Sequence, residues 1–151
     1  MLFRSKKCTN DSCVSYGYYQ NGEVASKSIY LPDSSKRSMI WHYDAKYYEN
    51  GQVKWTPFDP NGSRQTVINY YPSGSKHVQH DLWRMQRVGP YIEYYENGIV
   101  KVNGCYTDGE FIGYDVRGNK KTGKWSFYDE SGKLIKEEWY ENNVLLKTQN
   151  Y

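Results

Sequence analysis

Short aromatic segments and turn residues alternate along the whole chain. Two tyrosines, two further residues and a glycine form a phrase that occurs four times, and a variant of the phrase ends at Gly132. These copies cover 18–22, 47–51, 70–74, 94–98 and 127–132, and a half copy covers 139–143. Successive glycines of the phrase are 29, 23, 24 and 34 residues apart. A unit of about 23 to 24 residues, with insertions in two of the gaps, is typical of a repeat architecture.

Each phrase predicts the turn of a β-hairpin. Asn-Gly between aromatic and alternating segments favours a tight turn in which both residues have positive φ. The dipeptide occurs at 21–22, 50–51, 61–62, 97–98 and 103–104. After the turn, strict alternation would place Val100 and Val102 on one face of the strand, with Lys101 and Asn103 on the other.

The composition favours strands over helices. Alanine, the best helix former, occurs only at Ala25 and Ala45, whereas the chain has 17 Tyr and 5 Trp. The aromatic rings supply the core area that Leu, Ile, Val and Phe are too few to provide. We therefore predict an all-β protein with a thin aromatic core.

The charge balance narrows the possible partners. A net charge of +3 disfavours binding to a nucleic acid. Binding to a membrane surface is also disfavoured, because the sequence has neither a polybasic run nor an amphipathic helix. The longest apolar runs have three residues, too few for a membrane span. Three cysteines, an odd number, favour a cytoplasmic protein. If a signal preceding Met1 has been removed, the protein would be periplasmic or at the cell surface, and Cys8 and Cys13 would pair.

One copy of the unit resembles a known repeat in detail. Its matching residues are Gly123, Trp125, Tyr128, Gly132 and Tyr140, and a second copy matches at Gly89, Tyr94, Tyr95, Gly98, Tyr106 and Gly109. These residues resemble the MORN repeat family, in particular its bacterial repeat variant, and the resemblance covers about residues 16–146. It implies consecutive β-hairpins in an elongated, twisted antiparallel sheet, each repeat contacting mainly its neighbours.

The repeat pattern also predicts the organisation of the chain. We expect an N-terminal tail over 1–15 and a single domain of about five repeats over 16–151. The segments near 32–39, 75–90 and 108–122 break the pattern and are interpreted as insertions. The positions that the resemblance makes structural are Tyr19, Gly22, Tyr48, Gly51, Tyr71, Gly74, Tyr95, Gly98, Trp125, Tyr128, Gly132 and Tyr140.

No catalytic or metal motif stands out. His77 and His80 would point to opposite faces of a strand, so a metal site with Asp81 would need a turn or helix. The cysteines have no nucleophile motif around them, and neither a Gly-x-Ser-x-Gly elbow nor a Walker loop is present. We predict a protein without enzymatic activity, cofactor or metal.

Protein binding is the favoured function. Aromatic and arginine side chains are enriched at interfaces, and those outside the repeat pattern are the candidate partner-binding residues: Trp83, Arg84, Arg87, Tyr114 and Arg117. Bacterial proteins with this repeat variant are often described as antitoxin-like or immunity proteins. The resemblance therefore implies a bacterial immunity protein or antitoxin whose partner is a cognate toxin, with the active site of the toxin covered. The alternative is a structural scaffold that acts by self-association or membrane-surface attachment. The sequence leaves the oligomeric state open.

Overall fold

The computed structural model describes residues 3–9, 11–33, 38–58, 64–83, 86–108, 110–112, 115–117 and 119–151. These residues form fourteen strands. The strands are β1 (Phe3–Cys8), β2 (Cys13–Tyr18), β3 (Val24–Asp33), β4 (Ser38–Tyr47), β5 (Val53–Phe58), β6 (Gln65–Tyr70), β7 (Lys76–Trp83), β8 (Gln86–Tyr94), β9 (Val100–Tyr106), β10 (Glu110–Ile112), β11 (Asp115–Arg117), β12 (Lys121–Tyr128), β13 (Leu134–Glu141) and β14 (Val144–Asn150).

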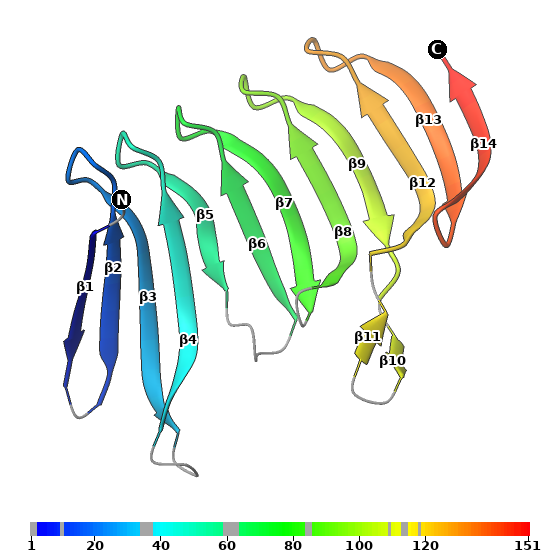
Figure 1. Ribbon diagram of the computed structural model, residues 1–151. Helices are drawn as coiled ribbons and strands as arrows, with labels where there is room; N and C mark the ends of the chain where they lie inside the picture. Colours follow the sequence, from blue (N-terminus) through cyan, green and yellow to red (C-terminus); the bar gives the residue numbers. More distant parts are fainter. Residues whose placement is uncertain are drawn as a thin grey trace.

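Twelve of the strands form one open antiparallel sheet in chain order, from β1 at one edge to β14 at the other (Figure 1). Only β10 and β11 leave this order, as a separate two-stranded hairpin between β9 and β12. Every pairing is between strands that follow each other in the chain, apart from β9 with β12 across this hairpin. The predicted all-β fold of consecutive hairpins is therefore confirmed.

The N-terminal segment belongs to the sheet. Residues 3–8 form β1, which pairs with β2 from Phe3↔Tyr18 to Cys8↔Cys13. The expected tail over 1–15 is wrong for this part of the chain, because backbone pairing does not require the repeat phrase. Cys8 and Cys13 form a disulfide, the pairing that the sequence associates with an oxidising compartment, and Cys105 is a free thiol.

The three pattern breaks have different structures. Around 32–39, β3 extends to Asp33 and β4 begins at Ser38, so the hairpin is longer rather than interrupted. Residues 76–83 and 86–94 are regular strands of the sheet, which corrects the insertion expected over 75–90. The segment near 108–122 does contain an excursion, the β10–β11 hairpin. Charged residues on exposed strand positions hide the alternation in the second segment.

The repeated turns differ from the predicted type. In the turn at 19–22, the Gly22 N–H donates to the Tyr19 carbonyl and the Tyr19 N–H donates to the Glu23 carbonyl. Gly22 has φ of 89°, whereas the preceding asparagine does not have positive φ. This is a three-residue loop with a glycine bulge, repeated at Gly51, Gly74, Gly98 and Gly132. Positive φ at both turn residues occurs instead at Asn142 and Asn143 between β13 and β14.

A β-bulge follows each of these turns. Tyr94 pairs with Val100 and Glu93 with Val102, so Lys101 is the extra residue and the predicted alternation over 100–103 is wrong. The register shifts at the same place in the other hairpins, at Ala25, Lys54, His77 and Ile135. The bulge residue lies against the second tyrosine of its own turn in three cases: Lys54 on Tyr48, His77 on Tyr71 and Lys101 on Tyr95.

The core is a cluster of aromatic rings on one face of the sheet, near its C-terminal end. Trp125 is 2% exposed, and Tyr106 meets it edge-to-face at 5.2 Å between ring centroids. Val102 completes the buried cluster, and Tyr91, Phe127 and Tyr140 pack against it. The Asn-Gly at 103–104 lies within β9 and is not a turn. Gly104 is covered by the Trp125 ring.

Candidate protein-binding surface

Two of the candidate binding residues lie at the same end of the sheet. Trp83 is the last residue of β7 and is partly exposed, and Arg87 is the second residue of β8 and is exposed. Arg84 and Tyr114 lie outside the described residues, as does the side chain of Arg117 in β11. We call the surface around Trp83 and Arg87 the rim.

The rim is attached to the segment that follows β11. The Arg87 N–H donates to Asn119 Oδ1 at 2.7 Å, and the Asn119 N–H donates to the Arg87 carbonyl at 2.8 Å. Asn119 has φ of 64°, a conformation that asparagine adopts more readily than most residues. These bonds hold Asn119, two residues after the end of β11, against β8 beside the rim.

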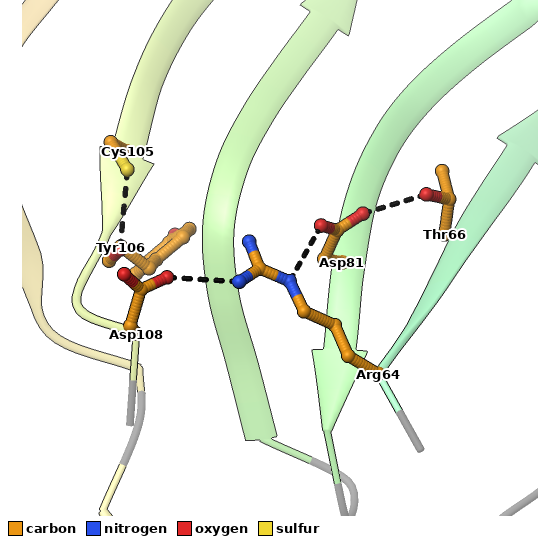
Figure 2. Close-up of polar contacts among 6 residues, drawn as sticks. All are labelled: Arg64, Thr66, Asp81, Cys105, Tyr106 and Asp108. Carbon is orange, nitrogen blue, oxygen red and sulfur yellow. Dashed lines mark hydrogen bonds and ion pairs between the residues drawn. The ribbon is translucent and has the colours of Figure 1, made fainter. Parts of the chain in front are cut away.

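An ion-pair network spans the sheet beside the rim (Figure 2). The Arg64 guanidinium lies 2.9 Å from Asp81 Oδ2 and 3.0 Å from Asp108 Oδ1, and Thr66 donates to the other oxygen of Asp81 at 2.7 Å. The hydrogen bond with Asp81 is the main reason that the pKa of Arg64 is raised. Two carboxylates therefore neutralise the Arg64 guanidinium. Arg87, which is exposed, forms no ion pair with a carboxylate of the described residues.

Gly89 makes the network possible. A Cβ at this position would lie 1.7 Å from Arg64 Nη2, and φ of Gly89 is +61°. The guanidinium therefore crosses β8 directly over a backbone without a side chain, between strands β7 and β9. The sequence analysis missed this network, because its members are 17 and 44 positions apart and no local motif connects them.

Burial and Arg87 control the charge of His80. His80 is 6% exposed and lies opposite Tyr91 in the sheet, and its Nδ1 has no hydrogen-bond partner among the residues that the structure describes. Burial first, and then the positive charge of Arg87, lower its pKa from 6.5 to about 4. His80 is thus a neutral core residue near pH 7 and does not add charge to the rim.

The described residues contain no group of three or more His, Cys, Asp and Glu side chains arranged to hold a metal ion. The Cys105 thiol donates to the Tyr106 carbonyl at 3.3 Å, and burial raises its pKa. A raised pKa keeps the sulfur protonated and makes it a weaker nucleophile. In the described part of the chain, no helix is long and apolar enough to span a bilayer.

The second tyrosine of each phrase connects neighbouring hairpins. Its hydroxyl donates to the carbonyl of the first tyrosine position in the next hairpin, at 2.8 to 2.9 Å. The four bonds are Tyr19 to Tyr47, Tyr48 to Tyr70, Tyr71 to Tyr94 and Tyr95 to Tyr128. We call Tyr19, Tyr48, Tyr71 and Tyr95 the linking tyrosines. Their role is structural, so they are unsuited to partner recognition.

Comparison with known families supports the repeat assignment in part of the chain. Residues 87–108 and 121–138 match the family model described as MORN repeat variant. The matches cover β8, β9, β12 and the first half of β13, the strands that hold the aromatic core. Comparison with curated proteins and with solved structures found no significant match. The two matched segments are thus similar to MORN repeat variants. MORN repeats are in general non-catalytic modules that bind proteins or membranes.

Proposed function

We propose that this protein is a non-enzymatic module that binds another protein through its open sheet. The observation that carries the proposal is the single layer: all the main-sheet strands lie side by side, and none of the described elements forms a second layer over either face (Figure 1). A sheet of this kind presents broad, partly exposed aromatic surfaces, which interfaces favour.

The rim is the proposed centre of this interface. Trp83 offers a partly exposed indole on one face of this end of the sheet, and Arg87 offers an exposed guanidinium on the other. Tryptophan and arginine are both enriched in binding hot spots. Neither lies in the repeated turns that hold the hairpins together. As the finer form of the proposal, the partner is a cognate toxin that the protein neutralises by covering its active site. This form rests only on the resemblance to the MORN repeat variant, because bacterial proteins with that variant are often described as antitoxin-like or immunity proteins.

A tagged pull-down from the native host, with mass spectrometry of the retained proteins, tests the proposal. We expect one stoichiometric partner, and we expect Trp83→Ala and Arg87→Ala each to reduce its retention. Lys133→Ala, an exposed turn residue at the opposite end of the sheet, is the matched control and should retain it. Full retention by both rim variants would exclude the rim, and a partner without toxicity would contradict the immunity role.

Self-association is the second candidate, favoured by the edge strand β14. Within the described residues β14 pairs only with β13, and Val144 and Leu146 are each 61% exposed. An edge strand whose outer N–H and C=O groups are unpaired, and which exposes apolar residues, can pair with another chain. Light scattering of the purified protein separates the candidates. A concentration-dependent oligomer without any retained partner would favour the scaffold over the binding module.

A further inference from the structure

From the second copy of the phrase onward, the first tyrosine position forms a row across the face opposite the aromatic core; in the first copy, the Tyr18 hydroxyl is instead bonded to the Ser5 hydroxyl at 3.0 Å. In β12, Tyr128 follows Phe127, so their side chains point to opposite faces, and Phe127 packs on the core cluster. Tyr94 holds the same place in β8, opposite Val100, as Tyr70 does in β6 and Tyr47 in β4. All four side chains are partly exposed. We call Tyr47, Tyr70, Tyr94 and Tyr128 the row tyrosines.

The hydroxyls of the row tyrosines are not used by the fold. Each linking tyrosine donates its hydroxyl to a backbone carbonyl, whereas no row tyrosine hydroxyl has a hydrogen-bond partner among the described residues. Each row tyrosine accepts the hydrogen bond of a linking tyrosine through its backbone carbonyl and not through its side chain. Its ring and hydroxyl therefore remain available to a ligand.

The spacing of the row selects an extended ligand. Successive row tyrosines are two strands apart, which corresponds to about 10 Å. The linking tyrosines bind successive turns to each other and keep this spacing regular. A polyproline II helix repeats every three residues, about 9.3 Å, and places every third side chain on one side. Prolines at every third position would thus meet successive rings.

The turns beside the row add a negative charge. Glu49, Glu96 and Glu130 occupy the same position in three turns, two residues after a row tyrosine, and all are exposed. None of them forms an ion pair with a described residue. On the row's own face, Lys124 is paired with Glu137 at 2.7 Å and Lys147 lies over the Trp139 ring. Lys27 and Lys76 also lie on this face, outside the three acidic turns. Charge complementarity therefore favours a basic ligand.

From these observations we infer that the row tyrosines form a docking surface for a proline-rich, basic segment of a partner protein in the polyproline II conformation. Prolines at every third position stack on the rings, and the tyrosine hydroxyls donate to the carbonyls of the ligand backbone. Arginine or lysine between the prolines pairs with the carboxylates of the turns. The inference rests on the proposed protein-binding function and names the class of partner and a second surface besides the rim.

A peptide of four Pro-Ala-Arg triplets tests the inference by fluorescence anisotropy against the full chain. We expect it to bind more tightly than a peptide of the same composition with irregularly spaced prolines. Tyr70→Ser combined with Tyr94→Ser should weaken binding by about tenfold or more, since aromatic anchors dominate such interfaces. The backbone carbonyls that accept from the linking tyrosines survive this change. Leu146→Ser, at an exposed position of the edge strand β14 away from the row, is the control and should bind like the wild type.

A charge reversal gives an independent arm. Glu96→Lys should weaken the Pro-Ala-Arg peptide and strengthen a Pro-Ala-Glu peptide of the same length. Equal binding of the regular and irregular peptides, or unchanged binding by the Tyr70/Tyr94 variant, would overturn the inference. The native pull-down distinguishes this failure from failure of the proposed function: a partner still retained by the Tyr70/Tyr94 variant leaves protein binding intact and excludes this surface.

Discussion

At the scale of single residues, glycine is required where an aromatic ring or a guanidinium lies against the backbone. Trp125 can be almost completely buried in a one-layer sheet because it lies flat on Gly104, with Tyr106 against its edge. A Cβ at Gly104 would lie 2.2 Å from Trp125 Cδ2. The close approach, and not a turn, is the reason for glycine at this position.

Gly104→Ala should therefore destabilise the protein by roughly 1 to 3 kcal/mol, because the indole must move out of its packed position. Chemical denaturation followed by tryptophan fluorescence measures the change. Gly17→Ala is the matched control, since its Cβ would meet only the Ser26 hydroxyl, which can rotate away, and we expect a cost below about 1 kcal/mol. Equal costs for the two variants would contradict the packing explanation.

His80 predicts a pH dependence of stability. Its pKa is lowered to about 4 in the folded protein, so between pH 6.5 and 4 the unfolded chain binds more protons than the folded one. Stability should thus fall as the pH is lowered through this window, by an amount on the order of 3 kcal/mol. Denaturant titrations of the wild type and His80→Leu at several pH values measure it. Parallel pH profiles of the two proteins would refute the assignment to His80.

At the scale of elements, each hairpin is defined by its own turn and pairs with the next hairpin through a backbone ladder, and one tyrosine hydroxyl bonds its turn to the next hairpin. The glycine bulge and the Asn side chain close the turn locally: Asn97 Oδ1 accepts from the Ile99 N–H, and Asn97 Nδ2 reaches the Glu130 carbonyl of the next turn. In the last copy Asp129 replaces the linking tyrosine and accepts from the Ser131 and Lys133 N–H groups of its own turn. The position of the linking tyrosine thus holds a different residue in the last copy, where no further repeated turn follows at this end of the sheet.

Tyr95→Phe should destabilise the protein by about 1 kcal/mol, because it removes the hydroxyl that donates to the Tyr128 carbonyl at 2.9 Å and leaves that carbonyl with one bond fewer. Tyr94→Phe, one residue away, removes a hydroxyl without a partner among the described residues and should change stability little. Thermal unfolding by circular dichroism compares the pair. A larger loss for Tyr94→Phe would reverse the assignment of the two tyrosine positions.

At the scale of the whole molecule, each hairpin contacts its neighbours along the sheet, and in the described part of the chain no distant segments close a common core. Such a molecule is stabilised by nearest-neighbour contacts, so its local stability can vary along the chain. The aromatic cluster supports β8, β9 and β12, whereas β14 at the edge exposes Val144, Leu145 and Leu146. The Arg64 network adds a long-range connection, because Arg64, just before β6, pairs with Asp108, just after β9.

Native-state hydrogen exchange should reveal this gradient. We expect amides of β9 and β12 to exchange slowest and those of β14 and β1 fastest, because each edge strand in the described structure is bonded on one side only. Mass spectrometry of peptic fragments after timed labelling gives the order. Uniform protection across all strands would mean that the sheet unfolds as a single cooperative unit.

The amino-acid sequence by itself determined that the chain forms consecutive hairpins and where the repeated turns lie, because tyrosine-rich segments and regularly spaced glycines are local signals. Trp125, Tyr128 and Gly132 are recognisable within their own hairpin. The sequence could not reveal which of two adjacent tyrosines donates its hydroxyl to the next hairpin. That choice depends on the face of the sheet to which each side chain points, and bulges such as the one at Lys101 change the faces. The sequence also missed β1, which has no repeat phrase.

Only the tertiary structure decided the surfaces. Arg64, Asp81 and Asp108 meet because the sheet brings their strands together over Gly89, and the row tyrosines become a regular series because the hairpins stack at a fixed spacing. These are relations between residues far apart in the chain. They arise from the register of the whole sheet, which no single segment encodes.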